Sequence, residues 1–335
     1  MSKPKRASST DVARLAGVSQ SAVSRAFSPG AVVSKATMAK VHAAADELGY
    51  RPNMLARSLI TRRTNMVALV TGDISNPHYA RTVNAFSLGL QKRGMHVLLI
   101  SLIEGQLVEA AIEEVLKYRV DGVIVISAKL SSDVGEACAK VGVPVVLYNR
   151  YVRQSNISSV RIENAEGGRR IADLLIDQGH HDVAFISGTE VDPTSGDRER
   201  GFVQRIEERG GKIVAQVSSD FGFDSGRAGL YKLWEATVRP TAVFCASDLI
   251  AFGAMDAARH DLGLGVPRDI AIAGFDDLPA ARWPSYDLTT IRQPVEAMAE
   301  LALDLLMEGI GSTSARPQTL LVPGELIVRS STAAP

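Results

Sequence analysis

From residue 66 onward, short apolar runs alternate with stretches of helical periodicity. The runs read MVALVTG, HVLLIS, GVIVIS, VPVVLY, VAFISG, TAVFCAS and IAIAGF. Between them, apolar residues recur every three to four positions over segments such as 79–93, 108–118, 165–177 and 249–262. Strands that alternate with helices form a parallel sheet with helices on both faces, and continuous apolar runs fit strands buried on both sides. There are too many strands for one compact sheet, so we expect two doubly wound α/β subdomains.

The first 63 residues differ from this pattern in both length and charge. They contain eleven Lys and Arg against three acids, a net charge of +8, although the whole 335-residue chain has 37 of each sign. The remaining residues therefore carry a net charge of −8. A small basic head on a large acidic body predicts that the head alone binds nucleic acid.

The head has the signals of two short helices joined by a tight turn. Thr10 can cap a helix over 11–16, and Gly17 can adopt the left-handed conformation that ends it. Ser19 can then cap a second helix over 20–28. This all-α arrangement is the helix-turn-helix pattern, and we expect the second helix to be the recognition helix.

A third helix is predicted over 35–48, capped by Ser34 and stopped by Gly49. Its apolar face should pack against the first two helices. The expected core residues of the head are Val12, Leu15, Ala16, Val18, Val23, Phe27, Met38, Val41, Ala45 and Leu48.

The outward face of the second helix carries polar residues but no acid. With Val23 on the buried face, this leaves Gln20, Ser21, Ser24 and Arg25 pointing outward. Gln can pair with adenine and Arg with guanine through two hydrogen bonds each, and Ser bonds several groups. We therefore predict that this face reads base edges in the major groove.

A short segment after the head, 53–58, fits a helix too short to be stable alone, and Pro52 suits the start of that helix. Leu59 follows it just before a polar linker, and Arg57 lies close by in the sequence. Leu59 either packs on a neighbouring domain or acts as an apolar wedge between base pairs in the minor groove.

The segments TDVARLAGVSQSAVSRAF and ADELGYRPNMLARSL, together with the body, resemble the lactose-repressor (LacI/GalR) family of bacterial regulators. The resemblance implies a dimeric repressor of palindromic operator DNA whose hinge helix becomes ordered on DNA. It makes Leu59 the wedge and Ala56 a close minor-groove contact. The expected DNA-contacting set is Thr10, Ser19, Gln20, Ser21, Ser24, Arg25, Asn53, Ala56, Arg57 and Leu59.

The resemblance also implies a periplasmic-binding-protein-like body in which the chain crosses between the two subdomains three times. We expect a DNA-binding domain over 8–51, a hinge helix and linker over 52–65, and an effector-binding and dimerisation domain over 66–332. The crossings are expected near 161–163, 288–292 and 318–320. The N-subdomain would then hold 66–162 and 292–318, and the C-subdomain 163–290 and 320–330.

Ligands of open parallel sheets bind beyond the carboxyl ends of the strands. Five apolar runs end in polar residues there: Asp73, Ser127, Asn149 with Arg150, Asp248, and Asp276 with Asp277. We interpret Asp73 and Asp277 as helix caps. Arg150, Asp248 and Asp276 are expected to converge on one cleft for a hydroxyl-rich ligand, with Arg198 opposite them.

The resemblance implies specific roles for several of these positions. Arg198 in DRERGF and Asp248 in CASDLIAFGAM match effector-binding residues of the family, and Phe221 matches a ring that often covers the ligand. His78 and Tyr79 match a segment that often faces the cleft, although a solvent-facing helix start is equally compatible with His78. The expected effector-binding set is His78, Tyr79, Ser127, Arg150, Arg198, Phe221, Asp248 and Asp276.

The identity of the effector stays open at this point. Two arginines, Arg150 and Arg198, would suit a sugar acid or a phosphate, whereas Asp248 and Phe221 would suit a neutral sugar. The resemblance favours a sugar or sugar derivative, and hence control of a carbohydrate-utilisation operon.

The competing functions are an α/β enzyme or a sugar carrier that uses the same cleft. Against an enzyme, TGDISN stands where a G-x-G-x-x-G would follow the first strand, and G-x-x-x-x-G-K-[ST] and G-x-S-x-G are absent. The six histidines lack metal-ligand spacing, so we expect neither metal nor cofactor. A carrier is disfavoured by the basic head and by the lack of a signal-peptide pattern.

No apolar run approaches the length of a membrane span, and Cys138 and Cys245 lie in apolar stretches typical of buried, reduced thiols. We therefore expect a cytoplasmic protein with no membrane partner. It should be a homodimer, with much of the contact made around 79–93. The chain ends in LIVRSSTAAP, without a leucine heptad that would make a tetramer.

Overall fold

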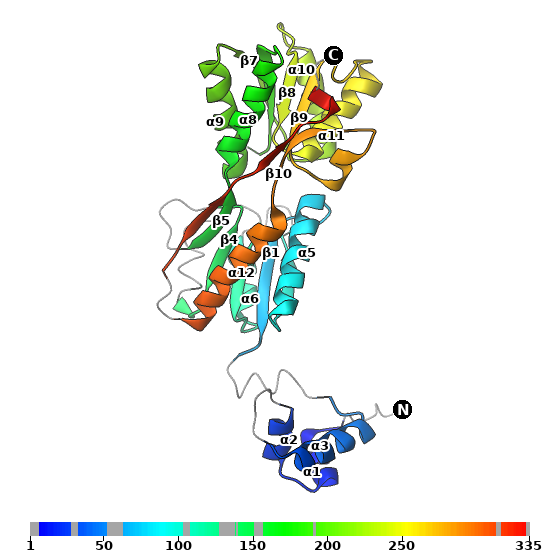
Figure 1. Ribbon diagram of the computed structural model, residues 1–335, viewed down its shortest axis with the longest axis vertical. Coiled ribbons are helices and arrows are strands. Elements are labelled where there is room, and N and C mark those ends of the chain that lie inside the picture. Colours follow the sequence, from blue (N-terminus) through cyan, green and yellow to red (C-terminus); the bar gives the residue numbers. More distant parts are fainter. Residues whose placement is uncertain are drawn as a thin grey trace. The chain divides into compact units, whose positions relative to one another are not determined.

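The computed structural model describes residues 7–27, 33–51, 63–102, 108–126, 138, 140–150, 157–189, 192–312 and 316–332. The chain divides into two compact units, Met1–Thr64 and Asn65–Pro335. The first unit is the head, and the second is the body, whose two sheets are described below (Figure 1).

The described part of the head consists of the three predicted helices, α1 (Ser9–Ala16), α2 (Gln20–Ala26) and α3 (Lys35–Glu47). Ser19 and Ser34 cap α2 and α3 as predicted, and Gly17 ends α1 in the left-handed conformation with φ 63°. The first cap was predicted wrongly, because Ser8 rather than Thr10 caps α1. Ser8 is favoured as the cap because Asp11 then occupies the third helical position and completes a reciprocal capping box.

The core of the head is smaller than the sequence indicated. Leu15, Met38 and Leu48 were predicted to be buried, yet they are 47%, 36% and 37% exposed. Alanines take the inner positions instead, and small side chains let short helices approach closely. The buried residues of the head are Val12, Ala13, Val23, Ala26, Val41, Ala44 and Ala45.

The N-subdomain of the body is a parallel six-stranded sheet in the order β11-β5-β4-β3-β1-β2. Alternate residues of β1 pack to opposite faces, Leu69 in the same cluster as Phe86 of α5, and Val70 with Ile112 of α6. The predicted burial on both faces is therefore confirmed for β1, β3 and β4, whereas the edge strand β2 is only partly buried. The elements are β1 (Met66–Thr71), α5 (Pro77–Lys92), β2 (His96–Ser101), α6 (Val108–Leu116), β3 (Gly122–Val125), β4 (Val145–Tyr148), β5 (Ser158–Ile162), α12 (Val295–Gly311) and β11 (Thr319–Val322).

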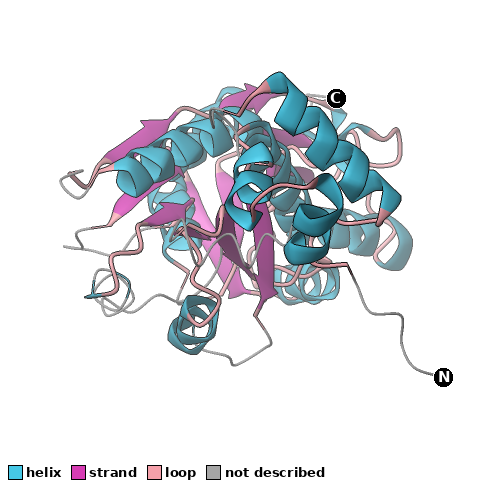
Figure 2. Cartoon of the chain, turned by 90° about the horizontal axis from the view of Figure 1, so that it is seen from below, coloured by secondary structure: helices cyan, strands magenta, loops and turns pink. Residues whose placement is uncertain are grey.

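The C-subdomain repeats this order as β12-β10-β9-β8-β6-β7, with only β12 antiparallel among the described strand pairs. Figure 2 shows the strands of the body with helices on both sides. The elements are α8 (Asn164–Asp177), β6 (Asp182–Ser187), α9 (Pro193–Glu208), β7 (Lys212–Ser218), α10 (Phe223–Trp234), β8 (Ala242–Cys245), α11 (Asp248–Asp256), η1 (Ala257–Asp261), β9 (Ala271–Asp276), η2 (Pro279–Arg282), β10 (Thr289–Arg292), β12 (Glu325–Ile327) and η3 (Ser330–Thr332).

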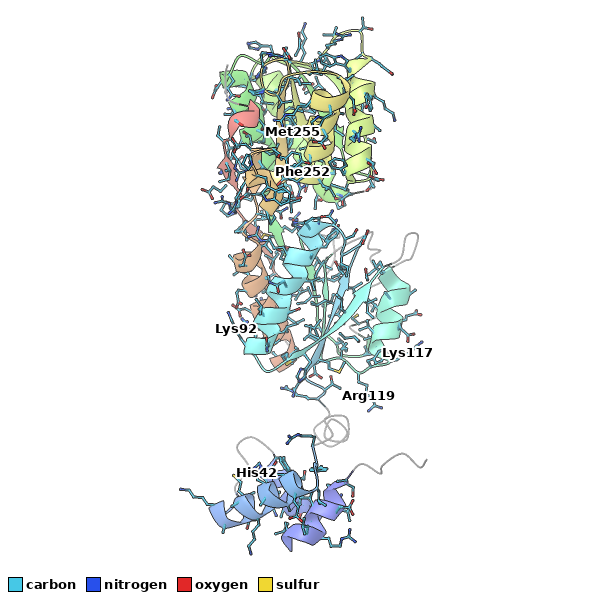
Figure 3. All side chains as sticks on the ribbon, turned by 90° about the vertical axis from the view of Figure 1, so that its right-hand side faces the viewer. His42, Lys92, Lys117, Arg119, Phe252 and Met255 are labelled. Carbon is cyan, nitrogen blue, oxygen red and sulfur yellow. The ribbon has the colours of Figure 1, made fainter. Side chains whose placement is uncertain are left out.

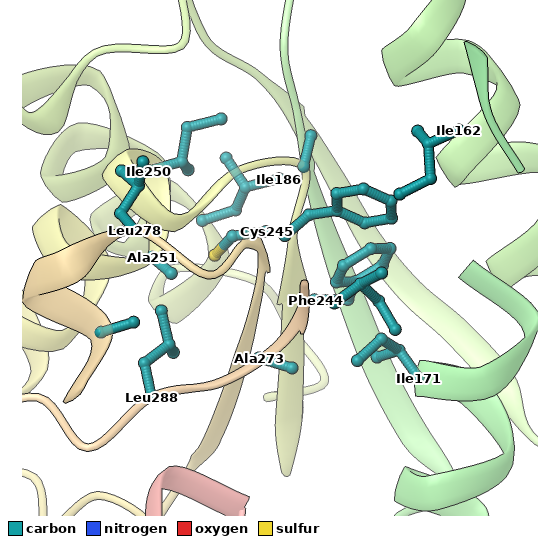
Figure 4. Packing of buried hydrophobic residues seen from close by; sticks show 14 of the residues in the cluster. Ile162, Ile171, Ile186, Phe244, Cys245, Ile250, Ala251, Ala273, Leu278 and Leu288 are labelled. Atoms are coloured by element: carbon teal, nitrogen blue, oxygen red, sulfur yellow. The ribbon is translucent and has the colours of Figure 1, made fainter. Parts of the chain in front are cut away.

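The interior of the C-subdomain is built from branched and aromatic side chains around Phe244 (Figure 4). Phe252 and Met255 of α11 point into this interior, whereas Lys92 and Lys117 lie on the surface of the N-subdomain (Figure 3). Both cysteines are buried and free, as predicted. Among the described residues, no helix combines the length and the hydropathy that crossing a membrane requires.

Two glycines bring α8 and α9 unusually close. A Cβ at Gly168 would overlap the carbonyl oxygen of Arg198, and a Cβ at Gly201 would overlap that of Ala165. The side chain of Arg198 can therefore reach Asn164 at the start of α8. This explains structurally why an arginine stands three residues before a glycine in DRERGF.

The chain crosses between the subdomains after β5, after β10 and between β11 and β12. The first crossing lies at residue 163, within the predicted range. The second lies at 293–294 and the third at 323–324, both later than predicted. The third crossing lies later because β11 pairs with β5 over four residues before the chain leaves the N-subdomain. A strand that short carries little pattern in the sequence.

Candidate functional site

The polar face predicted on the recognition helix is present on α2. Gln20, Ser21, Ser24 and Arg25 are all exposed, and the helix carries no acid. Gln20 Nε2 donates a hydrogen bond to Ser9 Oγ at 3.0 Å, and Arg25 Nε donates to the Ser21 carbonyl at 3.4 Å. The surface can therefore present donors and acceptors to base edges without repelling phosphate.

The other predicted DNA contacts fall into two groups. Thr10 is exposed on α1, and Ser19 is exposed while its Oγ accepts the Ala22 N–H at 3.2 Å as the cap of α2. The hinge contacts Asn53, Ala56, Arg57 and Leu59 lie outside the described residues.

The second candidate site is a cleft in the body, where the carboxyl ends of strands from both subdomains meet. It encloses about 420 Å³ of space, part of it open to solvent. Its lining residues are Asn76, His78, Tyr79, Ile126, Asn149, Arg150, Thr194, Arg198, Phe221, Ser247 and Asp276.

The structure brings six of the eight predicted effector contacts to this cleft: His78, Tyr79, Arg150, Arg198, Phe221 and Asp276. Ser127 lies outside the described residues. Asp248 does not line the cleft and is discussed below. Sequence reasoning missed Asn76, Ile126, Asn149, Thr194 and Ser247, and Asn149 had the clearest signal because it directly follows a strand.

Arg198 is held rigidly on the C-subdomain wall. Its Nε donates to Asn164 Oδ1 at 2.8 Å, its Nη1 donates to the Ala246 carbonyl at 2.5 Å, and its guanidinium stacks 3.7 Å from the centroid of the Phe275 ring. Its Nη2 lies 3.8 Å from Asp276 Oδ1. That separation is too long for a direct hydrogen bond, so a ligand hydroxyl can bridge these two groups.

Asp276 is connected to the N-subdomain through Gln293, a buried residue at the second crossing. Gln293 Nε2 donates to Asp276 Oδ1 at 2.5 Å, and Asn149 Nδ2 donates to Gln293 Oε1 at 3.1 Å. Within the described part of the chain, Asn149 Oδ1 is buried without a hydrogen-bond partner. An orphaned acceptor in a ligand cleft calls for a donor on the ligand, because leaving it unpaired costs about 1–3 kcal/mol.

His78 lies in the cleft, so its alternative placement as a solvent-facing helix start is wrong. Its side chain is only 12% exposed, and its Nδ1 lies 4.0 Å from Asp276 Oδ1. Burial lowers the pKa of His78 despite the opposing effect of the Asp276 carboxylate. The imidazole is therefore neutral at pH 7 and can offer one donor and one acceptor to a ligand.

Phe221 reaches the cleft through an unusual backbone conformation. Its φ is 68°, a value that residues other than glycine rarely adopt. Its ring packs directly on Gly188, where a Cβ would overlap the ring. The strained turn and the missing Cβ together place an aromatic face at the cleft, as strain often does at binding sites.

Asp248 lies behind the cleft and has a structural role. This finding corrects its assignment as an effector contact. It is fully buried, and its carboxylate accepts the Leu278 N–H at 2.7 Å and the Thr290 hydroxyl at 2.5 Å. Burial, reinforced by the nearby Asp276 carboxylate, raises the pKa of Asp248. Its neighbour Ser247 caps α11 and lines the cleft in its place.

The two aspartates interpreted as helix caps, Asp73 and Asp277, do not cap a helix in the structure. Asp277 is buried and accepts hydrogen bonds from Arg282 at 3.2 Å, Arg292 at 2.7 Å and Arg329 at 2.6 Å. Asp73 closes a turn by accepting from Ser75, and Asn76 caps α5 instead.

Comparisons with known proteins agree on the class of molecule. The profile of a family described as "Bacterial regulatory proteins, lacI family" matches residues 10–53, and that of a "Periplasmic binding protein-like domain" matches residues 172–332. The chain is 33% identical over 330 residues to an HTH-type transcriptional repressor PurR from Yersinia pestis (strain Pestoides F), covering 96% of each chain.

Solved structures give the same result. A lac repressor dimer bound to operator and the anti-inducer ONPF is 27% identical, with a TM-score of 0.90 over 98% of this chain and 100% of that one. A complex of the transcriptional regulator CelR with cellobiose is 32% identical, with a TM-score of 0.74 over 97% of this chain and 100% of that one. These relatives are named as transcription regulators, not as enzymes.

Proposed function

Because the chain belongs to the lacI family of bacterial regulatory proteins, we propose that it represses transcription as a dimer on a palindromic operator and that a neutral, hydroxyl-rich effector controls its affinity for that operator. Members of this family are DNA-binding repressors with a small-molecule domain, and this chain has both parts. A sugar is the simplest effector of this kind, and the controlled genes would then serve carbohydrate use.

One observation carries the choice of a neutral effector: the charges in the cleft are already balanced by the protein. Arg150 forms an ion pair with Asp192 at 2.9 Å, and Arg198 faces Asp276 at 3.8 Å. A sugar acid or a phosphate would add a buried negative charge without a partner, which is costly. A hydroxyl can both accept from Arg198 and donate to Asp276, and it can donate to Asn149 Oδ1.

A thermal-shift screen tests this proposal. We expect at least one neutral sugar or polyol to raise the Tm by several degrees at a concentration about 100 times its Kd, because saturation then adds about 2.7 kcal/mol. Matched sugar acids and nucleobases serve as the competing classes. A shift produced only by sugar acids or only by nucleobases would replace the neutral-effector proposal with that class.

The DNA-reading proposal rests on Arg25. Replacing Arg25 with alanine should remove about 1–3 kcal/mol of discrimination at one base pair of the half-site. Binding to a set of operators with single base changes, measured at fixed salt, checks this. Arg14→Ala is the matched control, since Arg14 is also exposed in the head but pairs with Asp11 at 2.9 Å. An equal loss on all sequences would make Arg25 a phosphate contact only.

The hinge and the dimer complete the proposal. Residues 52–59 would form a helix on operator DNA, with Leu59 as a wedge between base pairs and with Ala56, Asn53 and Arg57 near the minor groove. The dimer contact would involve α5, and twofold symmetry of the dimer would match the palindrome. These roles rest on family membership.

A further inference from the structure

An arginine of one subdomain is bound by an aspartate of the other across the cleft. Arg150 follows β4 of the N-subdomain, whereas Asp192 precedes α9 of the C-subdomain. Arg150 Nη2 lies 2.9 Å from Asp192 Oδ2, and Nη1 donates to Asp192 Oδ1 at 3.2 Å. Two parallel contacts of this kind form the geometrically specific arginine–carboxylate fork.

Asp192 is prearranged to receive that guanidinium. It is the N-cap of α9, and its Oδ1 accepts the Thr194 N–H at 2.8 Å and the Ser195 N–H at 3.2 Å. Although burial opposes ionisation, the Arg150 charge and the Thr194 hydrogen bond hold the pKa of Asp192 below its ordinary value. The bonds from Thr194 and Ser195 do not involve Arg150, so they fix the position of the carboxylate independently of the ion pair.

Further groups support the same contact. Arg150 Nη1 also donates to Thr194 Oγ1 at 2.9 Å, and Nη2 lies 3.5 Å from the Tyr79 hydroxyl. The side chains of Arg150 and Asp192 are only 9% and 10% exposed, so the ion pair is largely shielded from water. Opening the cleft would separate the two charges and return both to solvent.

We propose that the Arg150–Asp192 ion pair holds the cleft closed before any effector binds, so that the protein itself sets the balance between open and closed states. The effector would then bind to a closed state that is already populated and increase its population, rather than create that state. The ion pair concerns the body alone; its consequence for operator affinity rests on the proposed function.

The size of the effect is limited by solvation. In the closed state the fork gains two charge-assisted hydrogen bonds, but in the open state water solvates both ions. We therefore expect loss of the pair to shift the open-to-closed ratio on the order of tenfold, which corresponds to about 1.4 kcal/mol.

Hydrogen exchange of the full chain, without DNA or effector, measures this shift. Asp192→Asn removes the charge but keeps an N-cap residue, and Arg150→Met removes the partner. Both variants should exchange cleft amides in 76–82 and 192–198 about tenfold faster, while amides of β1 and β8 keep their protection.

Arg205→Met is the matched control. It also breaks an arginine–aspartate pair of α9, with Asp173 at 2.8 Å, but on the outer surface. It should leave exchange at the cleft unchanged. Wild-type rates at the cleft in either ion-pair variant, Asp192→Asn or Arg150→Met, would overturn the proposal, and acceleration in Asp192→Asn alone would assign the effect to the cap of α9.

A salt titration of the unmodified protein covers the case in which a variant does not fold. Raising NaCl from 50 to 500 mM should speed exchange at the cleft by about two- to threefold, because ions favour the separated charges. Exchange that is indifferent to salt would contradict the proposal. Neither measurement uses DNA or an effector, so a failure here is distinct from a failure of the repressor proposal.

Discussion

Replacing Asp277 with asparagine is expected to lower the free energy of unfolding by about 3 kcal/mol, because it leaves three arginines without their shared buried charge. The Asp277 side chain is fully buried, and it binds Arg282, Arg292 and Arg329. Asparagine keeps the size of the side chain and tolerates the positive φ of 51° at this position. Denaturant unfolding of the two proteins at pH 7 measures the difference.

Asp173→Asn is the control for this prediction. Asp173 also binds two arginines, Arg205 and Arg209, but its side chain is 33% exposed. A surface pair contributes little, so this variant should lose less than about 1 kcal/mol. Equal losses in the two variants would show that burial of Asp277 does not matter.

The same carboxylate predicts a pH dependence. Burial alone would raise the pKa of Asp277, but Arg292 and Arg329 hold it below the ordinary value. A group with a lowered pKa in the folded state stabilises the protein above its unfolded pKa of about 3.9, and this contribution disappears as the pH falls through the folded value. The stability difference between wild type and Asp277→Asn should therefore shrink below about pH 4.

Asp276→Asn is expected to weaken effector binding about 10- to 100-fold while leaving operator binding without effector nearly unchanged. The reason is that a hydrogen bond to a charged group contributes about 1.5–3 kcal/mol. Asp276 lines the cleft together with Arg198, whereas the predicted DNA contacts lie in the other unit of the chain. The measurement is an operator-binding titration in the presence of whichever compound the thermal-shift screen identifies.

Asp248→Asn distinguishes the two candidate aspartates. Asp248 bonds Leu278 and Thr290 behind the cleft, so its replacement should reduce stability but leave the effector Kd within about twofold of wild type once the protein is folded. A selective loss of effector response in Asp248→Asn, with Asp276→Asn unaffected, would move the site to Asp248.

The head was predictable because its signals are local. Ser19, Gly17 and Ser34 act within three or four residues of their own positions, and periodicity assigned the outward face of α2 correctly. The core of the head was less predictable. Whether Leu15 or Ala13 is buried depends on how three helices pack, and in the structure Ala13 is the buried residue.

The cleft was predictable as a place but not in its details. Strand ends indicated where polar residues gather, and the resemblance pointed to Arg198 and Phe221. The pairing of Arg150 with Asp192 joins residues 42 positions apart, on elements of different subdomains. No local pattern marks Asp192 as anything but a helix cap.

The amino-acid sequence by itself determined the basic head, the alternation of helices with seven of the twelve described strands, and the doubly wound body, because periodicity, caps and charge are properties of neighbouring residues. It did not mark β5, β7, β10, β11 and β12. Only the tertiary structure decided the roles of adjacent aspartates. Asp276 lines the cleft, while Asp277 binds three arginines, the farthest of them 52 residues away. The backbone turns at positive φ at both residues and sends the two side chains to different surroundings, and their partners come from elements that only the folded chain brings together.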